Sequence, residues 1–352
     1  MPRPTSARLL VLFGALTLGL SAPAEAGKKK KKKKEAPAAE APAAEAPAAE
    51  APAPDAAPAE FDVILPCSWD DSFVFTYEKT SRRADSRNPL LEQMEFSSAV
   101  TITSLGEGDP ARFRYATADM QVHGPEAVTA AAQPRVDRLA ALVPPMELRM
   151  EGGNLVAVEN FQEVADGTWA ATRDDVAAEA QAATEQMIRS PETGMALLLK
   201  EPMKFFSMHC VAMNLGEALE SEVAHPNPFG GPPIPGFSRV TLTELDAEAG
   251  VMVIETLDRT DPGALNSVLE GVMQKFAAEG MSEEEMAAKL EQVKAEMPPI
   301  ETVLTGKMVY STIDGFPHSI EIRQQIGAGD AIHRVEEHTW TRTAVGGEAE
   351  AE

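Results

Sequence analysis

The chain has 352 residues, of which 24% are charged and 44% hydrophobic, and its formal net charge is −24. Nine of its 31 basic and seven of its 55 acidic residues precede Phe61, so the rest of the chain holds 22 basic and 48 acidic residues and a net charge of −26. A surface this acidic repels phosphate backbones, which excludes nucleic acid as a partner of this part of the chain. Solubility or a saline habitat explains the charge; attraction of cations or basic partners is the alternative.

The first 26 residues have the pattern of an export signal. Arg3 and Arg8 lead into an apolar run from Leu9 to Leu20, and Ala24-Glu25-Ala26 is the small-x-small pattern that an export peptidase cuts. The run is too short to span a bilayer, which takes about 20 residues. We therefore expect residues 1–26 to be a signal peptide and the mature protein to be periplasmic or extracellular, although the positive charge that follows opposes translocation.

Residues 27–60 are low in complexity and predict a disordered tether. Seven lysines precede an EAPAA repeat that begins at Glu35, and alanine and proline bury too little area to build a core. Near anionic headgroups each lysine gains about 1 kcal/mol, which would dock the domain on an anionic membrane or cell-wall surface. A solvated charge block is the alternative. The docking residues would be Lys28, Lys29, Lys30, Lys31, Lys32, Lys33 and Lys34.

The remaining chain predicts a single α+β domain over residues 61–345, with a disordered tail over 346–352. Its two cysteines are Cys67 and Cys210. An even pair in an exported protein indicates a disulfide, and closing a loop of about 140 residues stabilises a fold by a few kcal/mol.

Apolar residues alternate with polar ones in the first half of this domain, which predicts hairpin strands. Gly152-Gly153 supplies the positive φ angles of a tight hairpin turn between two of them. The residues expected to share a face within their strands are Phe73, Phe75 and Tyr77, then Phe96, Val100 and Ile102, then Phe113 and Tyr115.

Helices are expected to interrupt the strands. Residues 174–189 carry a single apolar stripe, and a weaker helical pair surrounds Pro134 between Pro125 and Leu142. Two further helices are predicted, one from Pro262 to Gly280 and one from Ser282 to Met297, where Glu285 completes a capping box.

The second half again predicts strands joined by short turns, over residues 237–245, 251–257, 301–310, 317–325 and 331–341. Five hairpin-like connections exclude parallel pairing, which needs long crossovers. The fold predicted is α+β: a large, curved antiparallel sheet of about ten to eleven strands, a half-barrel, with amphipathic helices packed on one face. Its methionine-rich helices either fill the core or leave an apolar cavity for a lipid-like ligand.

The order of elements resembles the half-barrel of periplasmic lipoprotein-carrier proteins. The PMEL and EGG stretches from Pro145 to Gly153, and HPNPFGGPPIPG from His225 to Gly236, are also similar to uncharacterised secreted bacterial families. The resemblance implies an architecture and an apolar groove. The Pro-Gly segment itself is either a long crossover that returns the chain to the sheet, or a loop that rims a groove or carries a partner site.

No motif for catalysis, metal or cofactor is found. His333 and His338 have an odd separation, so on a strand they point to opposite faces. His209 and Cys210 are adjacent and rarely face each other as a nucleophile and base would. Asp246 to Gly250 predicts a plain turn rather than a calcium loop.

The function predicted is that of an exported, non-enzymatic protein without a cofactor. It is expected to be a monomer that binds an apolar or lipid-like ligand, or a partner protein, in a groove between sheet and helices. The alternative is a structural, envelope-associated module docked on an anionic surface by its polylysine arm.

Overall fold

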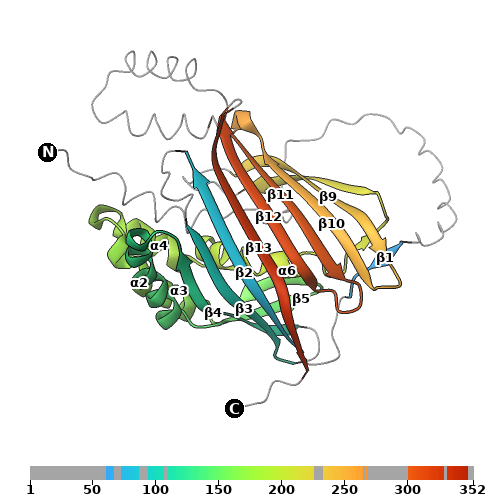
Figure 1. Ribbon diagram of the computed structural model, residues 1–352, viewed down its shortest axis with the longest axis horizontal. Coiled ribbons are helices and arrows are strands. Elements are labelled where there is room, and N and C mark those ends of the chain that lie inside the picture. Colours follow the sequence, from blue (N-terminus) through green and yellow to red (C-terminus); the bar gives the residue numbers. More distant parts are fainter. Residues whose placement is uncertain are drawn as a thin grey trace, which may run out of the picture.

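The computed structural model describes residues 61–66, 73–86, 94–106, 110–225, 233–264, 267, 300–328 and 331–347. In this part of the chain the protein is mostly β, with one open antiparallel sheet of 11 strands and a separate two-stranded pair (Figure 1). The strands are β1 (Val63–Ile64), β2 (Phe73–Asp85), β3 (Glu95–Ser104), β4 (Ala111–His123), β5 (Met146–Glu151), β6 (Asn154–Val158), β7 (Ala212–Met213), β8 (Ala218–His225), β9 (Ile234–Asp246), β10 (Val251–Thr260), β11 (Ile300–Ser311), β12 (Pro317–Ala328) and β13 (Ala331–Gly347).

The large sheet joins two meanders at its centre. Its strand order is β6-β5-β4-β3-β2-β13-β12-β11-β10-β9-β8, and every neighbouring pair is antiparallel. The first meander runs from β2 to β6 and the second from β8 to β13. The first strand of the large sheet in chain order, β2, therefore pairs with its last strand, β13, and the prediction of a large antiparallel sheet is confirmed.

Turn chemistry explains several of the hairpins. Gly152 and Gly153 have φ angles of 53° and 79° between β5 and β6, the left-handed conformation that glycine adopts without strain. Between β11 and β12, Gly315 has a φ of 73° and the Asp314 carboxylate accepts a hydrogen bond from the Phe316 backbone N–H at 2.8 Å. At the predicted plain turn after β9, the Asp246 carboxylate accepts backbone N–H bonds from residues 248 and 249.

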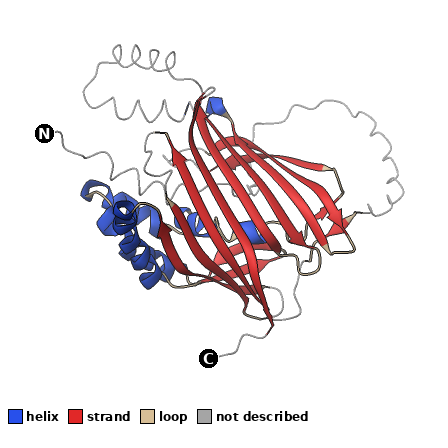
Figure 2. Ribbon diagram, in the orientation of Figure 1, coloured by secondary structure: helices blue, strands red, loops and turns tan. Residues whose placement is uncertain are grey.

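Helices occupy much of the segment between the meanders. They are α2 (Glu126–Leu142), α3 (Phe161–Thr172), α4 (Gln181–Arg189), α5 (Thr193–Leu199) and α6 (Met203–Phe206), with 3-10 turns η2 (Arg173–Asp175) and η3 (Ala178–Ala180). Figure 2 shows the longer helices gathered at the β4 side of the sheet. None of the helices described is long and apolar enough to cross a membrane.

Two helix predictions need correction. The expected pair around Pro134 is one continuous helix, α2. Beside the proline, Gln133 accepts a hydrogen bond from the Val122 backbone N–H at 2.9 Å and donates one to the Met120 carbonyl at 3.2 Å, which ties α2 to an irregular stretch of β4. The stripe expected over residues 174–189 is broken, because two 3-10 turns precede α4.

Other predicted elements differ or lie outside the described residues. Of the helix expected from Pro262 to Gly280, only residues 262–264 and 267 are described. The helix expected from Ser282 to Met297 lies outside the described residues. Strand β8 was not predicted; residues 226–232 of the Pro-Gly segment are outside as well. Since β8 and β9 are adjacent and antiparallel, this segment connects neighbouring strands and is not a crossover.

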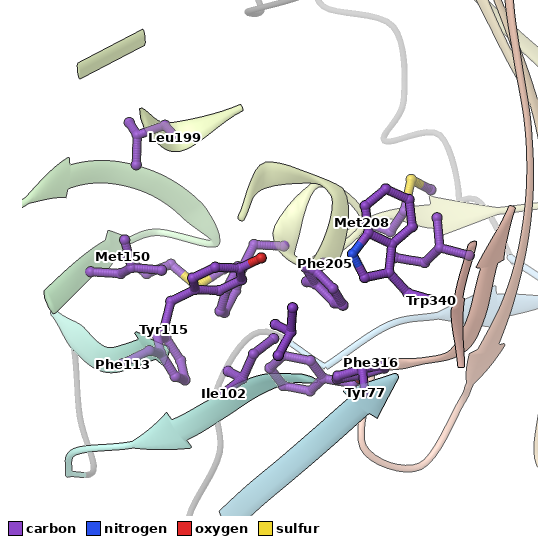
Figure 3. Close-up of a cluster of buried hydrophobic side chains, with 14 of the residues drawn as sticks. Tyr77, Ile102, Phe113, Tyr115, Met150, Leu199, Phe205, Met208, Phe316 and Trp340 are labelled. Atoms are coloured by element: carbon purple, nitrogen blue, oxygen red, sulfur yellow. The ribbon is translucent and has the colours of Figure 1, made fainter. Parts of the chain in front are cut away.

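Aromatic side chains fill the space between the sheet and α6. Phe205 packs against Tyr77, Tyr115 and Trp340, with ring centroids 4.8, 6.1 and 6.3 Å away (Figure 3). The neighbouring Phe206 lies 4.9 Å from Phe113, on β4. Such rings bury large apolar areas, so a short helix of four residues is held in place by tertiary packing rather than by its own propensity. The predicted inward faces of β2 and β4 are confirmed.

Candidate functional site

The core face of the sheet changes from apolar to charged along its two central strands. On β2, the buried Phe75 and Tyr77 are followed on the same face by polar residues. On the antiparallel β13 the corresponding polar residues precede Trp340. The register places four pairs directly opposite one another: Lys79 with Trp340, Ser81 with His338, Arg83 with Glu336 and Asp85 with Arg334. We call these eight residues, together with Tyr115, Lys200, Glu201 and Lys204, the buried cluster.

Glu201 lies between α5 and α6 and organises one end of the buried cluster. Both its carboxylate oxygens accept hydrogen bonds from Lys79 Nζ at 2.8 Å, and Oε1 also accepts from the Tyr115 hydroxyl at 2.8 Å and from Trp340 Nε1 at 3.3 Å. Burial disfavours the charged carboxylate, but the nearby Lys79 and Lys204 outweigh it and lower the pKa of Glu201 to about 2. Glu201 is therefore ionised at neutral pH.

The opposite end of the buried cluster is a network of arginines and carboxylates. Asp85 is 1% exposed and Glu336 3% exposed. Arg334 Nε donates to Glu336 Oε1 at 2.8 Å, and Arg83 lies 3.4 Å from the same oxygen and 3.5 Å from Asp85. Glu336 Oε2 is buried and makes no hydrogen bond within the described residues. Buried carboxylates need such partners, because an unpaired charge is costly in the interior.

Two lysines of the buried cluster have no carboxylate within salt-bridge distance in the part of the chain described. Lys200 Nζ is buried and has no hydrogen-bond partner there. Burial and the neighbouring charge of Lys204 lower the pKa of Lys200 to about 6. Lys204 Nζ lies 4.5 Å from the centroid of the Trp340 ring, a cation–π contact, and burial lowers its pKa to about 8 against the opposing charge of Glu201.

His338 is a neutral polar group at the centre of the buried cluster. It is 6% exposed, its Nδ1 lies 2.8 Å from the Ser81 hydroxyl, and its Nε2 is buried without a hydrogen-bond partner within the described residues. Burial, followed by the charges of Lys204 and Lys79, lowers the pKa of His338 to about 3. The imidazole is therefore uncharged at neutral pH and is suited to a hydrogen bond rather than to a salt bridge.

Two apolar side chains, Ile322 of β12 and Leu304 of β11, adjoin the buried cluster on the side of β11 and β12. We call them the apolar wall. Ile322 lies directly opposite His338, and Gln324 lies opposite Glu336. On the next strand Leu304 is opposite Gln324 and is only half-buried. The polar and apolar parts of the core face thus meet along β12 and β13.

The composition of the buried cluster limits its chemistry. Lys79, Arg83, Lys200, Lys204 and Arg334 are basic, whereas only Asp85, Glu201 and Glu336 are acidic. No group of three His, Cys, Asp or Glu side chains among the described residues is placed to hold a metal ion. This surplus of basic over acidic side chains, most of them partly buried, favours an anionic group as a ligand.

Of the disulfide and docking residues that the sequence predicts, only Cys210 lies within the described part of the chain, and it does not belong to the buried cluster. Cys210 has a φ of 60°, and its backbone N–H donates to the Pro66 carbonyl at 3.3 Å, while Cys67 lies outside the described residues. The seven lysines from Lys28 to Lys34 are outside them as well. His333 and His338 do point to opposite faces, exposed and buried respectively, whereas His209 packs on Phe206 and Phe316.

Sequence reasoning missed the buried cluster entirely. The polar residues after Tyr77 indicate the solvated end of a strand when β2 is considered alone. The signal that was available is that Lys79, Ser81, Arg83 and Asp85 keep the parity of Phe75 and Tyr77, so they lie on the core face.

A hollow of about 740 Å³ lies over strands β9 to β13 of the second meander. Most of the residues that line it are charged or threonine, including Arg239, Glu255, Lys307 and Glu321. Ile322 and His338 line it as well. Basic and acidic groups are balanced there, and this lining is typical of a solvated sheet face.

No protein-family model matches the chain, and no curated protein matches it either.

Proposed function

We propose that this protein is an exported, non-enzymatic binding protein that takes a lipid-like ligand between its sheet and its helices. The observation that carries the proposal is the juncture on the core face between an apolar wall, with Ile322 and Leu304, and a buried polar group of residues around His338. An amphiphile offers both surfaces that this juncture would contact. Buried polar atoms without partners are expensive in a purely structural core, so a ligand that satisfies them would bind favourably.

We also infer that the helices pack on the core face, as the half-barrel architecture requires. Support comes from Phe205 and Phe206 of α6, whose rings contact β2, β4 and β13 from that side. The Lys204 carbonyl accepts a hydrogen bond from the Tyr310 hydroxyl of β11 at 3.2 Å. A half-barrel closed in this way would hold its ligand beside α6, at the edge of the aromatic layer.

A displacement assay with a fluorescent fatty acid tests the binding proposal. We expect saturable uptake at micromolar concentration, with displacement by unlabelled fatty acid. A matched variant is Ile322→Lys, which places a charge on the apolar wall, with the exposed Ile332→Lys as its control. Absence of uptake by the folded wild-type protein, or equal uptake by Ile322→Lys and wild type, would contradict the proposal.

The location proposed is the periplasm or the cell exterior, with the Lys28–Lys34 arm as a docking element. Support comes from the sequence pattern of residues 1–26 and from the seven consecutive lysines. Sedimentation with anionic vesicles tests the arm: we expect binding that is lost when residues 28–34 are deleted. Binding that survives the deletion would show that the arm is not the docking element.

The disulfide between Cys67 and Cys210 is likewise a proposal. The hydrogen bond from Cys210 N to Pro66 O, at 3.3 Å, supports it, because that bond brings the backbone next to Cys67 beside Cys210.

A further inference from the structure

We propose that the buried cluster binds the anionic group of an amphiphile, with Lys200 and Lys204 supplying its positive charge and His338 Nε2 a hydrogen bond. This inference rests on the proposed lipid-binding function and assigns the ligand a class: an acidic head group on an apolar chain.

The first support is the distribution of charge. The chain after Phe61 has a net charge of −26, yet the buried cluster has five basic side chains and three acidic ones. Glu201 is occupied by Lys79, and Glu336 by Arg83 and Arg334. Lys200 and Lys204 are therefore left, within the described residues, without a carboxylate of their own. An added anion would provide the missing partner.

The second support is the set of buried polar atoms without partners. Lys200 Nζ and His338 Nε2 are both inaccessible to solvent and make no hydrogen bond within the described chain, as is also true of Arg83 Nε and Glu336 Oε2 at the opposite end of the buried cluster. Natural proteins satisfy nearly all such atoms, so Lys200 Nζ and His338 Nε2 need a partner, and the anionic group would supply one to both. Both atoms belong to residues that also share electrostatic neighbours, since Lys204 and Glu201 influence the pKa of Lys200 and of His338 alike.

The third support fixes the direction of the ligand. Ile322 is paired with His338 across β12 and β13, and the half-buried Leu304 lies one strand further away. A head group at Lys200 would therefore direct its chain along the wall on β11 and β12. The aromatic rings around Phe205 are closely packed, so the apolar chain of the ligand would lie on the other side of the buried cluster, along the apolar wall.

A series of ligands of one chain length tests the inference on the whole mature protein. We expect decanoate and decyl phosphate to displace the fluorescent fatty acid at least about tenfold more effectively than decanol. The two anions distinguish a carboxylate from a phosphate head group. Decanol that competes as well as both anions would overturn the inference and leave the lipid-binding function standing. Failure of all three would overturn the binding function itself.

Variants separate the two lysines from surface charge. We expect Lys200→Met and Lys204→Met each to weaken decanoate or decyl phosphate binding about tenfold while decanol binding is unchanged. Lys307→Met, on the exposed outer face, is the matched control and should bind as wild type does. If Lys307→Met has the same effect as Lys200→Met, long-range charge rather than the buried cluster is responsible, and the inference is wrong.

The pH dependence of ligand affinity distinguishes a lysine that contacts the ligand from one that has only a structural role. An anion beside Lys200 favours its protonated form, so binding takes up a proton and affinity increases as pH falls from 8 toward 6. Decanol should show no such trend. Below about pH 7, where Lys204 with its pKa of about 8 is already protonated, the increase should be lost in Lys200→Met, and an identical pH profile in this variant would contradict the assignment of Lys200.

Discussion

Tyr77 and Pro317 are 240 positions apart, and the buried Tyr77 hydroxyl donates a hydrogen bond to the Pro317 carbonyl at 2.9 Å. The bond joins β2 to the start of β12 and so supports the junction of the two meanders. We expect Tyr77→Phe to lower the free energy of unfolding by about 1 kcal/mol, since the carbonyl is left unpaired. Urea unfolding measures this. Ile313→Val, at a side chain 80% exposed, is the control, with an effect within about 0.5 kcal/mol.

Glu201→Gln tests the ion pair that organises the buried cluster. The substitution leaves Lys79 without its carboxylate and should lower the free energy of unfolding by about 2 kcal/mol at pH 7. In the folded protein the pKa of Glu201 is about 2, against an ordinary value of 4.5. Its contribution is therefore present above pH 4.5 and is lost as pH falls toward 2.

Urea unfolding at pH 7, 5 and 3 would show this contribution as a drop in wild-type stability that is smaller in Glu201→Gln. Parallel pH profiles for the two proteins would show that Glu201 does not carry it.

Lys200→Met should stabilise the free protein. The pKa of Lys200 is about 6 when folded and 10.5 ordinarily, with Lys204, Glu336, Glu201 and Arg334 as its charged neighbours. Between these values the unfolded chain binds more protons, so the free energy of unfolding rises with pH across that window. Removing the amine should raise stability by about 1–3 kcal/mol at pH 7 and flatten the rise.

Thermal unfolding of wild type and Lys200→Met between pH 6 and 9 is the measurement. A variant less stable than wild type at pH 7 would mean that the amine has a partner that stabilises it.

Gly153→Ala should destabilise the protein more than Gly152→Ala. Both residues have positive φ, but a Cβ on Gly153 would lie 2.6 Å from Cys210 Sγ, whereas one on Gly152 has nothing within 4 Å. We expect a cost of about 1 kcal/mol at Gly152 from conformation alone and about 2–3 kcal/mol at Gly153. Urea unfolding of the two variants compares them directly, and equal costs would show that Cys210 moves aside freely.

Reduction of the proposed Cys67–Cys210 disulfide should lower stability by about 2–4 kcal/mol. Intact mass with and without reductant, after alkylation, establishes whether the two thiols are joined. Cys210→Ser should unfold at the same urea concentration with or without reductant. A wild-type protein that alkylates at both cysteines without reductant has no such bond.

The local part of the fold could be predicted, because hairpins depend on neighbours in sequence. The turn at Gly152-Gly153 and the alternation of Phe75 and Tyr77 are both visible in short windows, and both are found in the structure. The pairing of β2 with β13 could not be predicted from short stretches of sequence, since it joins residues about 250 or more positions apart. Strand β8 was missed because its sequence, ALESEVAH, is mostly exposed and has little apolar alternation.

The candidate site could not be predicted from the sequence, because it too depends on contacts between distant segments. Lys200, Glu201 and Lys204 lie in a helical segment, and only the tertiary packing of Phe205 brings them over β2 and β13. Charged residues in a sequence are ordinarily exposed, so their burial cannot be inferred from composition. Only the parity of Lys79 with Tyr77 hinted at it.

The seam between β2 and β13 has a consequence for how the protein acquires its structure. Neither half of the sheet has its central neighbour until the last strand has left the ribosome, so the full sheet cannot assemble on a nascent chain. A sheet that is complete only once β13 is present would leave the chain partly unfolded during synthesis, and such a chain would be compatible with the export proposed above.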